Sequence, residues 1–137
     1  MDKAQAIDAF WNSFGWKAYD EGTVPDNAEM PRITYNVVTD SIGDSVLMHA
    51  SLWDRSTSWA RISKKAEEIG KAIEERTHKL IVGGVLKTFY PSIPIDDPAG
   101  RVFITKGSPF AQRMLEPSDD MVRRIYLNIN VEFFTAY

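Results

Sequence analysis

The sequence predicts an α+β fold in which two helices cover one face of a mainly antiparallel sheet. Three patterns carry this prediction: an aromatic-rich amphipathic segment near the N-terminus, an apolar seam of helical spacing over residues 59–73, and apolar–polar alternation over residues 122–134. The 137 residues fit one domain, so residues 1–137 are assigned to a single unit. The predicted order of elements is α-β-β-α-β-β-(short α)-β.

The first helix is predicted over residues 3–18. Its apolar residues share one face, and Asp2 precedes them as a candidate N-cap; the apolar residues are Ile7, Phe10, Trp11 and Phe14. The helix is expected to end at Asp20-Glu21-Gly22, before a polar loop that runs to Pro31.

An antiparallel hairpin is predicted from strands over residues 32–39 and 45–53, joined by a turn at residues 40–44. In the second strand, one face carries Val46, Met48, Ala50 and Leu52. The opposite face carries Leu47, His49, Ser51 and Trp53. This second face is mixed in polarity, so we expect that the helices leave it uncovered.

The second helix is predicted after Ser56-Thr57-Ser58, which offers N-cap choices. Its apolar seam consists of Trp59, Ile62, Ala66, Ile69 and Ile73. Burial of the Trp and the three Ile side chains contributes about 1.5–3 kcal/mol each, enough to dock the helix on a sheet.

The C-terminal half is predicted to hold three strands. The strand over residues 80–90 is interrupted at Gly83-Gly84 and forms a hairpin with residues 101–106. Three prolines in residues 91–100 indicate a long exposed loop between these strands. A single helical turn is expected at residues 110–115 and a loop at residues 117–120. The last strand, residues 122–134, buries Ile125, Leu127, Ile129, Val131 and Phe133.

Composition excludes several functional classes. The chain has no cysteine, so disulfides, thiolate metal sites and cysteine nucleophiles are excluded. The net charge of -3 does not favour a dedicated duplex-DNA binder. No apolar run approaches the ~20 residues of a membrane helix, and the N-terminus lacks the pattern of a signal peptide. We expect no association with a membrane and no export by the general secretory route.

No motif for catalysis, cofactor binding or metal binding emerges from the sequence. The two histidines, His49 and His78, have no metal-ligand spacing, and His78 is more simply a cation that follows a helix C-terminus. The loop acids form two pairs, Asp96-Asp97 and Asp119-Asp120, without calcium-loop spacing. Gly83-Gly84 lacks the pattern of a phosphate-binding loop. We therefore expect no enzyme activity, no cofactor and no metal.

Candidate interface residues come from three groups. The mixed strand face supplies Leu47, His49 and Trp53. The acidic loops supply Asp96, Asp97, Asp119 and Asp120. A basic tendency in the last third includes Arg113 and Arg123, beside Arg101, Lys106 and Arg124; these residues are either scattered surface charge or a contact for nucleic acid or an acidic partner.

Several short motifs occur in a specific order. They are Pro31-Arg32-Ile33-Thr34-Tyr35, then Trp53 at a strand end before the long helix, then Gly107-Ser108-Pro109-Phe110-Ala111-Gln112, then Arg123-Arg124-Ile125. This order, over residues 30–134, resembles the small tail-terminator and tail-completion proteins of long-tailed bacteriophages. The stretch of residues 91–100 departs from the pattern by its length.

The resemblance implies a structural virion protein without an active site. Such proteins form rings, usually hexameric, that cap the tail tube, stop its polymerisation and present a surface to the head connector. The implied partners are copies of the chain itself, the tail tube protein, the head connector and DNA in transit through the lumen. The implied location is the tail or neck of the virion, assembled in the host cytoplasm.

Three alternatives remain open at this stage. The chain is also compatible with another neck or tail-tube component of the same particle. A small nucleic-acid-binding module that uses the C-terminal basic residues is a second class. A third is a ligand-binding or enzymatic domain, which would need a pocket that unites His49 with distant acids.

Overall fold

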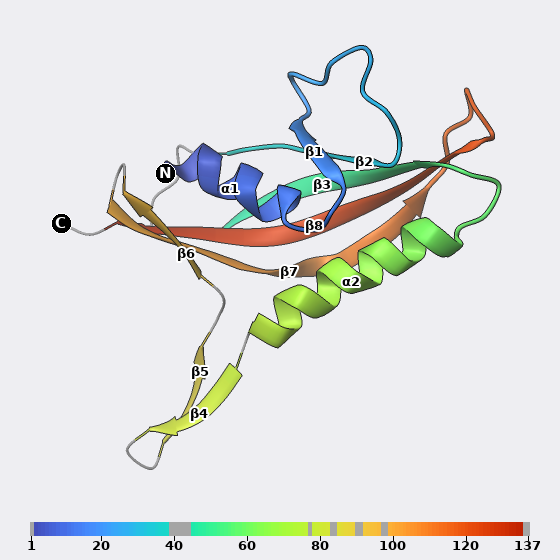
Figure 1. Ribbon diagram of the computed structural model, residues 1–137. Coiled ribbons are helices and arrows are strands. Elements are labelled where there is room, and N and C mark those ends of the chain that lie inside the picture. The colour runs from blue at the N-terminus through green and yellow to red at the C-terminus, as the bar shows by residue number, and fades with distance from the viewer. Residues whose placement is uncertain are drawn as a thin grey trace.

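The computed structural model describes residues 2–38, 45–76, 78–82, 85–89, 92–96 and 99–135 (Figure 1). Its elements, in chain order, are α1 (Lys3–Asn12), β1 (Lys17–Asp20), β2 (Arg32–Tyr35), β3 (Ser45–Arg55), α2 (Ala60–Arg76), β4 (His78–Val82), β5 (Val85–Phe89), β6 (Ser92–Asp96), β7 (Ala99–Met114) and β8 (Val122–Thr135). Six strands form one sheet in the order β1-β2-β3-β8-β7-β6, and β4 and β5 form a separate two-stranded sheet.

The predicted fold class is wrong in two respects. The six-stranded sheet is mixed, because β1 pairs with β2 in parallel while its other pairings are antiparallel. The described chain also has eight strands and two helices, where five strands and three helices were predicted. The sheet curls like half of a barrel around α1 and α2 (Figure 1). Helix α1 contacts both edge strands, β1 and β6, and so lies across the opening of the curl.

The first helix is shorter than predicted. Asp2 is its N-cap, as expected, and forms a capping box with Gln5. The helix ends at Asn12 because Gly15 takes a positive φ of 86°, a conformation that a helix does not continue through. The Asn12 side chain then caps the edge of β1, since its Oδ1 accepts a hydrogen bond from the Ala18 backbone N–H at 3.0 Å.

The strand alternation predicted for β3 and β8 is confirmed. These strands pair antiparallel over their length, with Met48 opposite Ile129, and Leu52 opposite Ile125. Their inward side chains are buried against both helices. The predicted turn at residues 40–44 lies outside the described residues.

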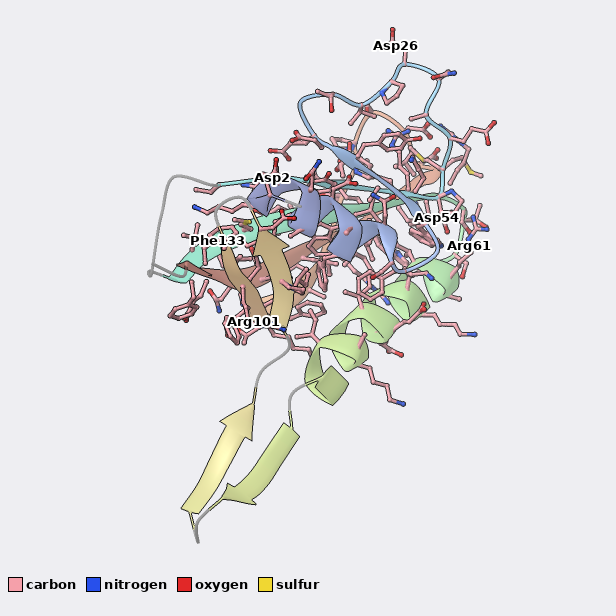
Figure 2. The ribbon with its side chains drawn as sticks, turned by 60° about the vertical axis from the view of Figure 1, so that its left-hand side comes forward. Asp2, Asp26, Asp54, Arg61, Arg101 and Phe133 are labelled. Carbon is pink, nitrogen blue, oxygen red and sulfur yellow. The ribbon has the colours of Figure 1, made fainter. Side chains whose placement is uncertain are left out.

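The second helix is also confirmed, from Ala60 to Arg76. Ile62, Ile69 and Ile73 of the seam are buried, while Trp59 is half-buried at its start. An ion pair ties this end of α2 to the sheet: the fully buried carboxylate of Asp54 accepts hydrogen bonds from Nε and Nη2 of Arg61 (Figure 2). This ion pair fixes the point at which α2 crosses the sheet.

The predicted pairing in the C-terminal half is wrong. Strand β4 pairs with β5, with Ile81 opposite Leu86, and neither joins residues 101–106. The stretch of residues 91–100, predicted as a loop, contains β6 and the start of β7. Pro94 is tolerated there because β6 is an edge strand. Gly83-Gly84, predicted as a bulge, lies outside the described residues.

The helical turn predicted at residues 110–115 is wrong, because β7 continues through it to Met114. Residues 107–110 bulge out, and pairing resumes at Ala111 opposite Leu127. The bulge needs a glycine at its start: a Cβ at Gly107 would lie 2.8–3.0 Å from Asn128, including that residue's backbone. The bulge brings Phe110 against α2, where a Cβ on Gly70 would meet its ring at 2.9 Å.

A buried tyrosine links α1 to β2. The Tyr35 hydroxyl donates to Oδ1 of Asp8 at 2.5 Å. Burial, the hydrogen bond to Asp8 and the negative charges of Asp8 and Asp20 raise the pKa of Tyr35 well above its usual value.

A test of this link is the stability of Tyr35→Phe against alkaline pH. Because the pKa of Tyr35 is raised in the folded state, the contribution of its protonated form is complete below about pH 10 and is lost as pH rises through the folded value. We expect Tyr35→Phe to cost about 1 kcal/mol near neutral pH. The difference from wild type should shrink above pH ~10 in urea titrations. A constant difference across this range would contradict the assigned bond.

Candidate assembly surfaces

The convex face of the six-stranded sheet is not covered by either helix. It carries the outward residues of β3, β7 and β8, which alternate with the buried core residues. As predicted, the outward residues of β3 include Leu47, His49 and Trp53. The three residues differ in the contacts that they already make within their own chain.

Trp53 is held between two arginines. Arg32 and Arg124 lie over its ring, with guanidinium carbons 5.9 and 4.7 Å from the ring centre, and its indole N–H donates to Thr34 Oγ1 at 2.9 Å. Arg124 is fixed in turn by bonds to Ser51 and Glu116. Trp53 is therefore half-buried in a cross-strand row and already has partners in its own chain.

His49 and Leu47 lie further along β3. The imidazole of His49 stacks on Tyr126, with ring centres 5.2 Å apart, and its Nε2 lies 3.2 Å from Oε2 of Glu21. Leu47 is 60% exposed. Of the three predicted residues on this face, Leu47 offers the most uncovered apolar surface. The side chain of His78 lies outside what the structure describes.

Arg113 and Arg123 meet away from that face. Both guanidinium groups lie over Trp59 at the start of α2, at 4.8 and 5.5 Å from its ring centre. Arg123 also donates to the backbone oxygens of Asp120 and Thr57. These arginines hold the β7–β8 loop against α2, and neither forms a continuous basic strip with the Trp53 row.

The acidic pairs do not come together. Asp96 ends β6, whereas Asp119 and Asp120 lie in the β7–β8 loop at the other end of the sheet (Figure 1). Asp97 lies outside the described residues. The Met121 backbone N–H, followed by the side chain of Arg55, lowers the pKa of Asp119. Asp119 therefore shapes its own loop, and within the described ranges no three His, Asp or Glu side chains are grouped to hold a metal.

The loop between β7 and β8 exposes apolar side chains that the sequence reasoning missed. Leu115 is 88% exposed, and Met114 and Met121 are also exposed. They line or flank an open hollow of about 240 Å³ that is also bordered by Trp59 and Pro117. Exposed apolar side chains that gather at one loop are a candidate contact surface. The sequence feature that could have revealed this surface is the pair of apolar residues Leu115 and Met121, which stand on either side of the acidic loop.

A second missed feature is a hollow on the convex face near the ends of β7 and β8. It measures about 470 Å³ and is lined by Phe103, Thr105, Glu132 and Phe134. The two phenylalanine rings pack edge to face, 5.3 Å apart, and Phe134 is 46% exposed. Glu132 is half-buried, and none of the described residues gives it a hydrogen bond or an ion pair.

The third missed feature is the β4–β5 hairpin, which projects away from the helices and the six-stranded sheet (Figures 1 and 2). Among the described strands, β4 and β5 pair only with each other. Their ten residues include two lysines and one histidine but no acid: His78–Val82 reads HKLIV and Val85–Phe89 reads VLKTF. A two-stranded sheet of this size is marginally stable alone.

No helix in the described part of the chain has the length and apolar character needed to cross a membrane. Comparison of the chain with protein-family models, with curated proteins and with solved structures finds no match.

Proposed function

We propose that this chain is a structural subunit that assembles with copies of itself into a closed ring at the end of a bacteriophage tail tube. In this role it stops tube polymerisation and joins the tail to the head connector. The observation that carries the proposal is the projecting β4–β5 hairpin, an apolar arm without a strand partner among the described residues of its own chain.

The sequence of the hairpin supports assembly. In its register, Val82 lies opposite Val85, and Ile81 lies opposite Leu86. Because adjacent residues of a strand alternate between faces, both faces of the hairpin carry apolar residues. Contact with a single partner buries only one face of the hairpin. A hairpin with apolar residues on both faces therefore buries the most apolar surface area when it lies between other chains.

The tail-end location rests on the motif resemblance. Three of its motifs lie in neighbouring strands, and Arg32, Trp53 and Arg124 form one row across β2, β3 and β8. The fourth motif forms the bulge of β7. The four short motifs therefore serve one continuous sheet, as parts of one structural unit. The apolar tip around Leu115 is the proposed contact for the tube or connector.

The nucleic-acid-binding alternative loses its main support. Arg113 and Arg123 are engaged with Trp59, and Arg124 with Trp53 and Glu116, so they do not form a free basic surface. Another neck or tail-tube component remains the alternative within the virion.

Immunogold electron microscopy of purified tails tests the location. The proposal predicts that antibody against this chain labels one end of each tail, at a disc-shaped terminus. Labelling along the whole tube would identify a tube subunit instead. Intact tails without label would contradict a role in the particle.

A further inference from the structure

We infer that the β4–β5 hairpin of one copy docks in the hollow lined by Phe103, Thr105, Glu132 and Phe134 on the convex face of the next copy. This inference rests on the proposed self-assembly and names its interface. Its basis is a match between two features that the chain itself carries: an apolar, basic arm and an apolar hollow with an acid in it.

Charge supports the match. Glu132 is half-buried beside two phenylalanine rings and has no partner among the described residues, an arrangement that favours a cationic group on whatever fills the hollow. The described residues of the hairpin include no acid, and Lys87 lies opposite Leu80, on the face that we propose docks. A lysine side chain combines an apolar stem, which can pack on aromatic rings, with an ammonium group that can reach a carboxylate.

The apolar surface of the hollow and of the hairpin also supports the proposed docking. The hollow exposes Phe134, and the half-buried Phe103 lies beside it. The hairpin supplies Leu80, Val82 and Val85 at alternate positions of one face. A second copy is the occupant because the hairpin of the same chain runs away from the sheet (Figures 1 and 2).

The geometry of such a contact determines the kind of assembly. Arm and hollow are different parts of the chain, so each contact is heterologous and leaves one free arm and one free hollow. Copies then add head to tail until the last arm reaches the first hollow, which produces a ring.

Disulfide trapping tests the contact directly, because the natural chain has no cysteine. Val85→Cys places a thiol on the face of β5 that carries Lys87, and Thr105→Cys places one in the hollow. The two full-length variants are mixed and oxidised mildly. We expect a disulfide-linked heterodimer from this pair and none when Val85→Cys is mixed with Lys64→Cys, on the exposed face of α2.

Charge reversal gives a second readout. Glu132→Lys in the Thr105→Cys variant should abolish trapping, and Lys87→Glu in the Val85→Cys variant should restore it. Unchanged melting of the Glu132→Lys monomer serves as the folding control, because Glu132 has no described partner to lose.

Three outcomes would overturn the inference. An assembled ring in which only the Lys64→Cys pair cross-links would place the hairpin elsewhere and leave the proposed function standing. A disulfide dimer of Val85→Cys alone would show that the arms pair with one another. A chain that stays monomeric would overturn both this contact and the proposed assembly.

Discussion

Ile125→Asp is expected to prevent folding. Ile125 lies on the inner face of β8, opposite Leu52, and is buried. The substitution removes a buried side chain, at a cost of about 2–5 kcal/mol, and places an unpaired carboxylate in the core, at a further cost of several kcal/mol. The sum is comparable to the total stability of about 5–15 kcal/mol for a domain. Circular dichroism and size-exclusion chromatography of the purified variant measure the loss.

Leu47→Asp is the matched control. Leu47 lies on the convex side of β3 and is largely exposed, so an aspartate there remains solvated. We expect this variant to fold with nearly the stability of wild type. If Ile125→Asp melted like Leu47→Asp, the assignment of inner and outer faces would be wrong.

Removal of the β4–β5 hairpin is expected to abolish assembly while the body stays folded. A short Gly-Ser linker would replace residues 78–89. Because β4 and β5 form their own sheet, this change removes no pairing from the six-stranded sheet. The variant should therefore keep the melting temperature of the isolated subunit but run as a monomer in sedimentation experiments.

Leu115→Ser is the control for this deletion. It reduces exposed apolar surface in the β7–β8 loop, away from the arm and its proposed hollow. We expect it to leave the ring intact and to weaken attachment to tails. A ring that persists without the hairpin would show that other surfaces hold the copies together.

The elements that the sequence predicted well are those with a long, uninterrupted pattern. Strand β8 alternates over five buried positions, and α2 keeps one apolar seam through Ile62, Ile69 and Ile73, so local periodicity alone identifies them. The pattern fails where pairing overrides local signals. Residues 107–110 look like a strand end, yet Asn128 on β8 holds the bulge, through its bond to the Pro109 oxygen, and pairing resumes.

Which strands pair with one another was harder to predict from the sequence. The sequence does not reveal that β4 pairs with β5 and not with residues 101–106, because each of these apolar segments suits either pairing. The start of the parallel strand β1 was hidden for another reason: Trp16 and Ala18 fit a continued helix, and only the positive φ of Gly15 ends it.

For the candidate surfaces, alternation correctly placed Leu47, His49 and Trp53 on the uncovered face. It did not reveal that Arg32 and Arg124 cover Trp53, since these arginines come from β2 and β8. The hollow around Glu132 likewise needs the register of β7 against β8, which brings Phe103 opposite Glu132. Such sites depend on contacts between distant segments.

Native mass spectrometry of the full-length protein over a range of concentrations tests whether this chain works by joining copies of itself. We expect one dominant species whose mass is a fixed multiple of the subunit and which does not grow further as concentration rises, because a closed ring has no free arm. A monomer at every concentration, or a ladder of ever larger species, would contradict it.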